Sequence, residues 1–391
     1  MNRRATIMSW LQAGLRAVDP RVLTSAALAG ESGPLTVIAI GKAAPEMCWG
    51  AYDAVGHIEG LCIASRHLQL PDGVELIVGD HPIPGESSLR AGMRALEVSA
   101  EADLALISGG GSALCEVPAD GLDLQLIADV NQRMLKAGTS IEVVNMVRSH
   151  LSQIKGGGLG ALPTLILSDV AGASPAVVSS GPTIGSTRSP EMVLELLADL
   201  GFAADHNLEE AVRRPGAPPN AEQRVLLIGD GRDAATAIAK TASTEAQASV
   251  ADGWIRGDYL SALEKFLEAA ATGVTVAAGE ASVPVEEGGV GGRNTHTALS
   301  AARLIAGTGI WFAALATDGG DGNSGSAGAI VDGTTIIRGG PPDEALRTFD
   351  SATYLRQSRD LIETGPTGTN VADVWLVWKP DADLEPILAS S

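Results

Sequence analysis

Three glycines between two serines follow a short apolar run and could bind an anion. Leu104–Ile107 is apolar and leads directly into Ser108-Gly109-Gly110-Gly111-Ser112. Glycine lets a backbone bend sharply and approach a ligand closely, and successive N–H groups at the start of a helix attract phosphate. We therefore expect here either a phosphate-binding loop or an ordinary turn between a strand and a helix.

Two basic residues stand in comparable positions. Lys42 follows the apolar run Leu35–Ile40, and Arg293 follows the glycine-dense loop 286–292 and precedes an expected helix. A transferring phosphoryl group requires cations and backbone N–H groups around it. A solvated turn residue is the alternative for Lys42.

Acidic residues follow two further apolar runs. Asp318 and Asp321 lie three residues apart in the glycine-rich segment after Ile310–Ala316, and Asp169 ends the run that begins at Thr164. Proteins hold Mg²⁺ with one or two carboxylates together with the phosphate oxygens of a substrate, so the Asp318 and Asp321 pair suits this ion. An ordinary acidic turn is the alternative.

Four polar residues are candidates for substrate binding. His81 lies in the proline-rich turn Asp80–Pro84, while Asn145, Arg148 and Lys155 fall on or near the polar face of an expected helix. Basic side chains grouped in this way stand out in an acidic chain. A structural turn and a solvated helix face are the alternatives.

The charge of the chain restricts its ligands. Its 391 residues include 27 Lys and Arg against 47 Asp and Glu, which gives a formal net charge of -20. Nucleic acids and anionic membranes bind clustered basic residues, so we expect neither as a partner. A small anionic ligand needs only a few basic residues placed locally.

The segment Gly229–Ala234 suggests a different ligand. It follows an apolar run, matches the G-x-G-x-x-A pattern of dinucleotide-binding folds, and has Asp252 about where a ribose-binding acid falls. As an alternative, it predicts an NAD(P)-dependent reductase. The carboxylate of Asp230 counts against this interpretation, because it would face the pyrophosphate.

Short apolar runs that alternate with helical patterns must position these residues. Such runs are typical of parallel strands buried on both faces, which bind ligands at their carboxyl ends. A chain of this length forms two domains, and the proline-rich segment Arg213–Asn220 is the best boundary. We expect a larger, Rossmann-like, doubly wound α/β domain over residues 1–215 and a smaller α/β domain over residues 222–391.

Other features favour a soluble, cytoplasmic protein. Residues 1–18 predict an amphipathic helix, with Met8, Leu11, Leu15 and Val18 on its apolar face, rather than a signal sequence. No run approaches the ~18 apolar residues of a membrane span. The three cysteines are far apart, which is typical of thiols in a reducing compartment. The oligomeric state stays open, a homodimer included.

Taken together and in order, these segments resemble the class II glycerate 2-kinases, whose C-terminal part is called the MOFRL domain. The resemblance spans nearly the whole chain. It rests on Gly41–Ala44, Asp80–Pro84, Leu106–Ala113, Asn145–Arg148 with Lys155–Gly157, Leu167–Val170 with Ser180–Thr183, Gly291–Asn294, Thr317–Gly319 and Thr369–Val371.

The resemblance implies ATP- and Mg²⁺-dependent phosphorylation of D-glycerate to 2-phosphoglycerate in a cleft between the two domains. Lys42 and Arg293 would stabilise the transferring phosphoryl group, and the Ser108–Ser112 loop would hold nucleotide phosphates. The acids would bind metal or accept a proton: Asp169 as a catalytic residue, and Asp318, Asp321 and Glu280 at the metal. Members of the family often carry the name hydroxypyruvate reductase.

Several positions depart from the usual pattern of this family. Thr295-His296 replaces Gln-Glu, Asn323-Ser324-Gly325 replaces Pro-Thr-Asp, Ala281 replaces Thr, and Gly158 replaces Arg. Because these positions fall in the expected cleft, a related hydroxy acid as acceptor is kept as an alternative, as is a non-catalytic nucleotide-binding relative.

Overall fold

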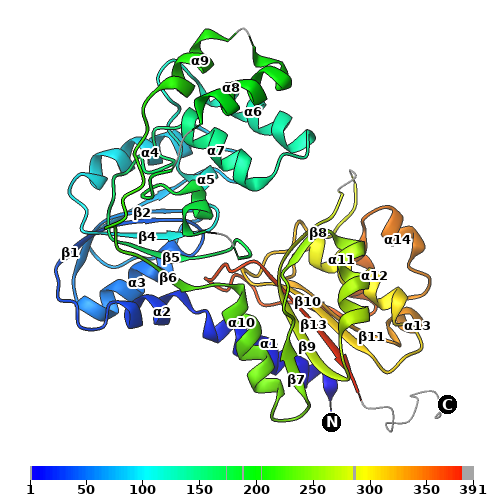
Figure 1. Ribbon diagram of the computed structural model, residues 1–391. Helices are drawn as coiled ribbons and strands as arrows, with labels where there is room; N and C mark the ends of the chain where they lie inside the picture. Colours follow the sequence, from blue (N-terminus) through cyan, green and yellow to red (C-terminus); the bar gives the residue numbers. More distant parts are fainter. Residues whose placement is uncertain (1, 173, 187–188, 204, 285–287, 381–391) are drawn as a thin grey trace. The chain divides into compact units, whose positions relative to one another are not determined.

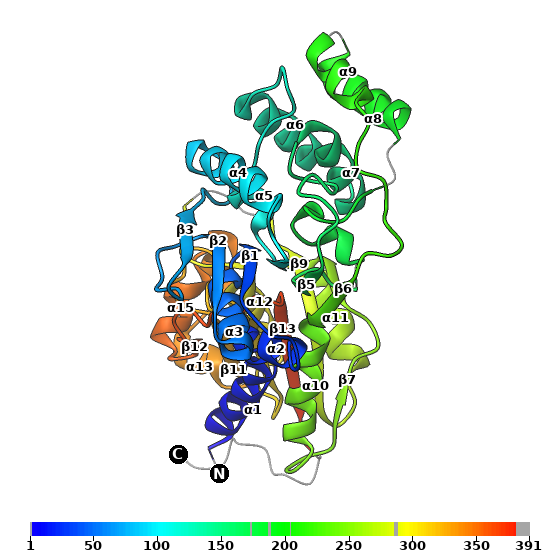
Figure 2. The same cartoon turned by 90° about the vertical axis from the view of Figure 1, so that its left-hand side faces the viewer.

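A computed structural model describes residues 2–172, 174–186, 189–203, 205–284 and 288–380. It divides the chain into two compact units, whose elements Figures 1 and 2 show from two sides. The N-terminal unit comprises Pro20–Ser168 and Ala173–Ile228. The C-terminal unit comprises Met1–Asp19, Asp169–Gly172 and Gly229–Ser391.

A six-stranded sheet forms the centre of the N-terminal unit. Its strands are β1 (Leu35–Ile40), β2 (Ile58–Ala64), β3 (Val74–Val78), β4 (Leu104–Ser108), β5 (Thr164–Leu167) and β6 (Val225–Gly229). The order β3-β2-β1-β4-β5-β6 is that of a Rossmann fold, and β1 pairs in parallel with both β2 and β4. The expected doubly wound sheet is therefore confirmed.

Helices cover this sheet. In Figure 1, α2 (Pro20–Ala27) and α3 (Ala44–Val55) lie below it, while α4 (Glu86–Ser99) and the one-turn helix α5 (Gly111–Leu114) lie above it. Residues Val37–Ile40 of β1 are buried, as a strand covered on both faces requires.

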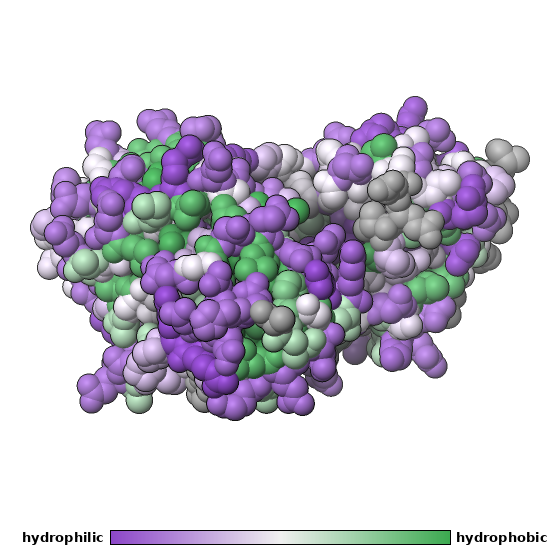
Figure 3. Space-filling view, turned by 90° about the horizontal axis from the view of Figure 1, so that it is seen from above, coloured by the Kyte–Doolittle hydropathy of each residue, from purple (hydrophilic) through white to green (hydrophobic). Residues whose placement is uncertain are grey.

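A second helical group in this unit has an apolar cluster of its own. It contains α6 (Leu124–Lys136), α7 (Ile141–Leu151), α8 (Pro190–Leu197), the short helix η2 (Ala198–Phe202) and α9 (His206–Arg213), and buries side chains such as Val130, Val147 and Leu208. Seen from above in Figure 3, green apolar areas lie between purple hydrophilic ones on the surface of this unit. We did not predict α9 from the sequence, although its buried residues Leu208, Ala211 and Val212 are spaced as on one helix face.

The C-terminal unit contains a mixed sheet. Its strands are β7 (Ala248–Val250), β8 (Ile255–Asp258), β9 (Gly273–Ser282), β10 (Trp311–Ala316), β11 (Gly328–Asp332), β12 (Leu361–Ile362) and β13 (Asp373–Lys379), in the order β12-β11-β10-β13-β9-β7 with β8 beside β9. β13 runs antiparallel to both β10 and β9. The expected second α/β fold is confirmed, with antiparallel pairs at its centre.

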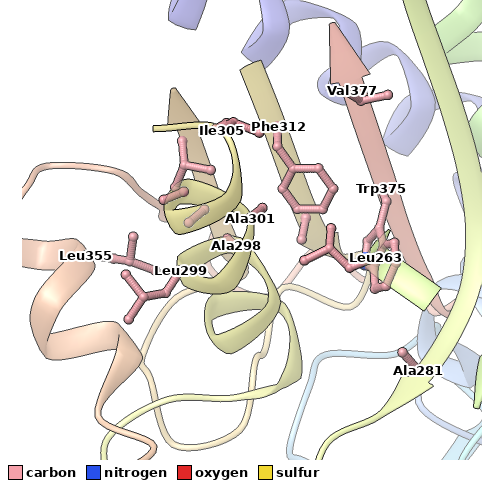
Figure 4. Close-up of a cluster of buried hydrophobic side chains, with 14 of the residues drawn as sticks. Leu263, Ala281, Ala298, Leu299, Ala301, Ile305, Phe312, Leu355, Trp375 and Val377 are labelled. Atoms are coloured by element: carbon pink, nitrogen blue, oxygen red, sulfur yellow. The ribbon is translucent and has the colours of Figure 1, made fainter. Parts of the chain in front are cut away.

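Apolar side chains fix the helices of this unit onto the sheet. Figure 4 shows Phe312 of β10 and Trp375 of β13 beside Leu263, with the ring centres of the two aromatic residues 5.9 Å apart. Leu299 faces Leu355 in the same cluster. The helices are α10 (Gly231–Ala242), α11 (Tyr259–Ala269), α12 (Arg293–Leu304), α13 (Thr335–Gly339), α14 (Asp343–Arg347) and α15 (Ser351–Gln357).

The first helix, α1 (Arg3–Ala17), belongs to the C-terminal unit. It is amphipathic as expected, with the expected Leu11 and Val18 buried, but its buried face also holds Ile7, Trp10 and Gly14, whereas the expected Met8 and Leu15 are only partly buried. A Cβ atom on Gly14 would lie 2.6 Å from Cγ1 of Ile238 in α10, so glycine permits the close approach of the two helices.

The division of the chain thus differs from the expected ranges 1–215 and 222–391. Helix α1 packs on α10 and joins the C-terminal unit, while β6 extends the N-terminal sheet beyond the expected boundary at Arg213–Asn220. Among the described residues, no helix combines the length and apolar character that crossing a membrane requires.

Candidate active site

Lys42 and the glycine turn lie side by side in the N-terminal unit. They follow the neighbouring parallel strands β1 and β4, whose carboxyl ends meet at one edge of the sheet. The backbone N–H of Lys42 donates to the Gly109 carbonyl at 2.9 Å, and that of Ala43 donates to Ser108 Oγ at 3.1 Å. Gly110 has φ 87°, and a Cβ atom there would lie 3.1 Å from Cγ of Lys42. A glycine at this position therefore allows the lysine side chain to pass over the turn.

Two serines brace the turn from the short helix η1 (Pro175–Ser180). Ser179 Oγ donates to the Ser108 carbonyl at 2.6 Å and accepts from the Gly111 N–H at 3.0 Å. The hydroxyls of Ser180 and Ser112 lie 2.7 Å apart. Both Ser179 and Ser180 have positive φ, at 52° and 60°, a strained conformation that clusters at functional sites. The sequence marked Ser180 only through the family resemblance and did not single out Ser179.

Asn145 and Arg148 extend this network along α7. Ser180 Oγ donates to Asn145 Oδ1 at 2.7 Å, and Arg148 Nε donates to Asn131 Oδ1 at 2.9 Å. Arg148 is half-buried, and burial lowers its pKa. Among the described residues, burial is the cause of this shift and no carboxylate contributes to it. Its guanidinium is therefore suited to an anionic ligand.

Lys155 is buried and forms an ion pair with Glu116. Its Nζ contacts Glu116, and the side chains of this pair are 2% and 1% exposed. Glu116 Oε1 also accepts a hydrogen bond from Ser152 Oγ at 2.5 Å. Burial lowers the pKa of Lys155 to about 7. These contacts favour a structural role, in contrast to the substrate contact expected from the sequence.

A pocket of about 490 Å³ adjoins the turn. It brings together five of the expected site residues, namely His81, Gly110, Ser112, Arg148 and Lys155. The other residues around it are Pro82, Ile83, Pro84, Ala113, Gln125, Ala128, Asp129, Asn131 and Gln132.

The C-terminal unit places Arg293 at the edge of its sheet. Arg293 begins α12, and its Nε and Nη2 donate to the two carboxylate oxygens of Asp373 at 2.5 and 3.2 Å. Its Nη1 contacts Glu280. In the strand register Asp373 lies beside both Gly279 and Ala316, so the end of β9, the start of β13 and the end of β10 meet here.

The charges of this cluster are strongly coupled. Burial acts to lower the pKa of Arg293, but the carboxylates of Asp373 and Glu280 outweigh it and raise that pKa. Burial raises the pKa of Asp373 to about 6 against the opposing effect of Arg293. Arg293 therefore keeps its positive charge at neutral pH.

Asp321 caps the helix that carries Arg293. Its Oδ1 and Oδ2 accept from the backbone N–H groups of Asn294 and Thr295, each at 2.8 Å, and the residue is 2% exposed. A carboxylate used in this way stabilises a helix N-terminus. These contacts favour a positioning role for Asp321, in contrast to the metal contact expected from the sequence.

Asp318 and Asp169 are the better candidates for binding a metal or accepting a proton. Asp318 follows β10 and accepts from the Gly320 N–H at 3.0 Å, and Asp169 Oδ2 accepts from Asn370 Nδ2 at 3.1 Å. The next residue, Val371, donates through its N–H to Thr317 Oγ1 at 2.9 Å, so the two acids are linked by a short chain of contacts. Carboxylate oxygens of this kind fit Mg²⁺, which needs one or two of them. No group of three or more His, Cys, Asp and Glu arranged for a metal occurs in the described residues.

The dinucleotide pattern at Gly229–Ala234 has a structural explanation. Asp230 Oδ1 accepts from the N–H groups of Arg232 and Asp233 at 2.7 and 3.3 Å, and so caps α10. The amides that a pyrophosphate would need are therefore already occupied by a carboxylate. This geometry disfavours the reductase alternative.

Comparison with known proteins decides the family. The family model described as "Domain of unknown function (DUF4147)" matches residues 6–215, more than half of the chain, and the MOFRL family model matches residues 273–373. The D-glycerate 2-kinase of Thermotoga maritima is 33% identical over 86% of this chain and 89% of its own. The chain belongs to the glycerate 2-kinase family.

Two further comparisons agree with this membership. A crystal structure of the Thermotoga maritima glycerate kinase matches with a TM-score of 0.82 and 29% identity, over 96% of this chain and 99% of that one. An Agrobacterium vitis protein, provisionally named hydroxypyruvate reductase, is 32% identical over 96% of this chain and 94% of its own. The expected mixture of names within the family is thus confirmed.

The departures from the glycerate 2-kinase pattern lie mostly in packed positions. Thr295 is buried, and its Oγ1 accepts from the Gly292 N–H at 2.8 Å; His296 is 3% exposed and stacks on Phe349. A Cβ atom on Gly158 would lie 1.9 Å from the Gln153 carbonyl oxygen, so this backbone admits no arginine there. These substitutions therefore affect residues that pack around the site and hold it in place.

Asn323 has a comparable supporting role. Its Oδ1 accepts from the Gly291 N–H at 2.7 Å, and its Nδ2 donates to the Gly289 carbonyl at 3.1 Å. The amide thus fixes the loop that precedes Arg293. Glu286 and Glu287 of the same loop lie outside the described residues.

Proposed function

We propose that this protein transfers the terminal phosphoryl group of ATP to D-glycerate and forms 2-phosphoglycerate. The observation that carries the proposal is the pair of hydrogen bonds that Arg293 donates to Asp373. This pair lies at the same sheet edge as Asp318. The D-glycerate 2-kinase name of the Thermotoga maritima relative supports it.

The chain supplies most parts that phosphoryl transfer requires. The Ser108–Ser112 turn holds nucleotide phosphates through backbone N–H groups and the Ser112 hydroxyl, and Lys42 crosses the turn to neutralise their charge. Arg293 stabilises the equatorial oxygens of the transferring group, and its raised pKa keeps it protonated throughout.

Asp318 and Asp169 act on the metal ion and on the acceptor hydroxyl. Mg²⁺, when bound, neutralises negative charge on the phosphate oxygens, and Asp318 is its first protein ligand in this proposal. Asp169 accepts the proton of the acceptor hydroxyl, with Asn370 fixing its carboxylate. Asn145 helps to hold the small hydroxy acid.

A substrate screen tests the proposal. Purified protein with ATP and Mg²⁺ should release ADP when D-glycerate is added and should release little with other small hydroxy acids. Lys42→Ala should abolish the release, while Lys240→Ala, at an exposed lysine of α10, should leave it unchanged. Failure of every acid to elicit ADP would refute the kinase, and oxidation of NADH by hydroxypyruvate would favour the reductase.

A further inference from the structure

We propose that the pocket beside the glycine turn holds the adenosine part of the nucleotide, between α6 and the turn His81–Pro84. This inference rests on the proposed kinase function, and it assigns a binding site to residues outside the phosphate loop.

The size of the pocket and its connection to the turn support this assignment. Its volume of about 490 Å³ lies in the range of sites for ligands much larger than a three-carbon acid. Gly110 and Ser112 belong to its wall and also to the proposed phosphate loop. A nucleotide whose phosphates lie on that loop therefore has this space open to its nucleoside.

Apolar residues form one side of the pocket. Pro82, Ile83 and Pro84 contribute their side chains from the turn after β3, and the small residues Ala113 and Ala128 leave room opposite the larger ones. Ile83 is 66% exposed, so its apolar surface is open to a ligand. A purine ring, with its two apolar faces, would cover this surface.

Amide side chains on one face of α6 complement the polar edge of such a ring. Gln125, Ala128, Asp129 and Gln132 are spaced by three and four residues, so they share one face of the helix and all line the pocket. A primary amide both donates and accepts hydrogen bonds, as an adenine edge requires. Asp129, whose charge is shared with Arg133 at 3.0 Å, can accept from ribose hydroxyls.

The positive charge of Arg148 favours a negatively charged ligand in this pocket. Arg148 is a half-buried cation on the pocket wall, and in the described part of the chain its side-chain contact is with the neutral amide of Asn131. A polyphosphate brings the negative charge that this position lacks. A neutral ligand would leave the guanidinium without compensation.

Direct binding of ADP and of D-glycerate to the full chain tests the inference by titration calorimetry. Ala128→Trp fills the pocket and should weaken ADP binding by about tenfold or more, while D-glycerate binding stays unchanged. Ala137→Trp, at an exposed position just beyond α6, is the matched control and should change neither affinity. Thermal unfolding of each variant confirms that it is folded.

A gentler variant covers the case in which tryptophan disrupts the fold. Gln125→Ala with Gln132→Ala removes only exposed amides and should weaken ADP binding by about tenfold at an unchanged melting temperature. Unchanged ADP affinity in folded variants, or a loss confined to D-glycerate, would overturn the inference while leaving the kinase proposal intact. Absence of ADP binding and of ADP release in the unaltered protein would refute both.

Discussion

Both carboxylate oxygens of Asp373 accept hydrogen bonds from Arg293, and the two side chains differ sharply in burial. The Asp373 side chain is 2% exposed, whereas that of Arg293 is 37% exposed. The carboxylate is anchored at the start of β13 in the centre of the sheet, while the guanidinium reaches toward the surface. The pair therefore orients a cation that a ligand can still approach.

Removing Arg293 should harm stability as well as catalysis. Arg293→Ala leaves Asp373 buried without its partner, which should lower the free energy of unfolding by about 2 kcal/mol, a value reduced because Arg293 is partly exposed. It should lower kcat by about 10²-fold or more. Adding Asp373→Asn should restore much of the stability, measured by urea unfolding, but none of the activity. A double variant no more stable than the single one would disprove the pairing argument.

The acids near Arg293 should differ in their effect on the magnesium requirement. Asp318→Asn should raise the Mg²⁺ concentration needed for half-maximal rate, because it removes a proposed ligand. Asp321→Asn should leave that concentration unchanged but lower the free energy of unfolding by about 1 kcal/mol, because it weakens the cap of α12. Magnesium titrations of the rate distinguish the two, and equal shifts in both variants would contradict the assignment.

The buried pair of Lys155 and Glu116 should matter for folding. Lys155→Met leaves a buried carboxylate unpaired and should cost about 3 kcal/mol of unfolding free energy, and adding Glu116→Gln should recover most of it. The folded double variant should keep the affinity for D-glycerate. A large rise in KM for the acid would instead restore Lys155 as a substrate contact.

His296 should make the protein sensitive to acid. Burial lowers its pKa to about 4, whereas the unfolded chain has the ordinary value of about 6.5. As the pH falls through this window the unfolded state gains a proton that the folded state does not, so stability falls. Asp373, with its raised pKa, acts in the opposite direction, so the test compares wild type with His296→Gln. The free-energy difference between them should change by up to about 3 kcal/mol between pH 7 and pH 4. A difference independent of pH would show that His296 titrates normally.

Elements with strong local patterns could be predicted from the sequence. The run that became β1 was predicted with its observed bounds, because an apolar strand ends where glycine begins a turn. The glycine turn, Lys42 and Arg293 were found for the same reason. Helix α9 and the region from β11 to β12 were missed, because their segments are short and depend on packing across the unit.

The residues that hold the site in place could not be predicted from local sequence patterns. Asp373 is the first residue of a strand and belongs to no motif, and only the register of β13 between β9 and β10 brings it to Arg293. Glu116 likewise belongs to no motif, and it contacts Lys155, which lies 39 residues further along the chain. For Asp321, the spacing from Asp318 suggested a metal pair, whereas the fold turns its carboxylate onto a helix end.

Phosphorus NMR of a reaction with ATP, Mg²⁺ and D-glycerate tests the central claim most directly. It separates ADP from unreacted ATP and distinguishes a phosphate on the 2-hydroxyl from one on the 3-hydroxyl. We predict equal amounts of ADP and 2-phosphoglycerate, and neither product with Lys42→Ala. ATP that stays intact, or release of inorganic phosphate with no phosphorylated acid, would contradict it.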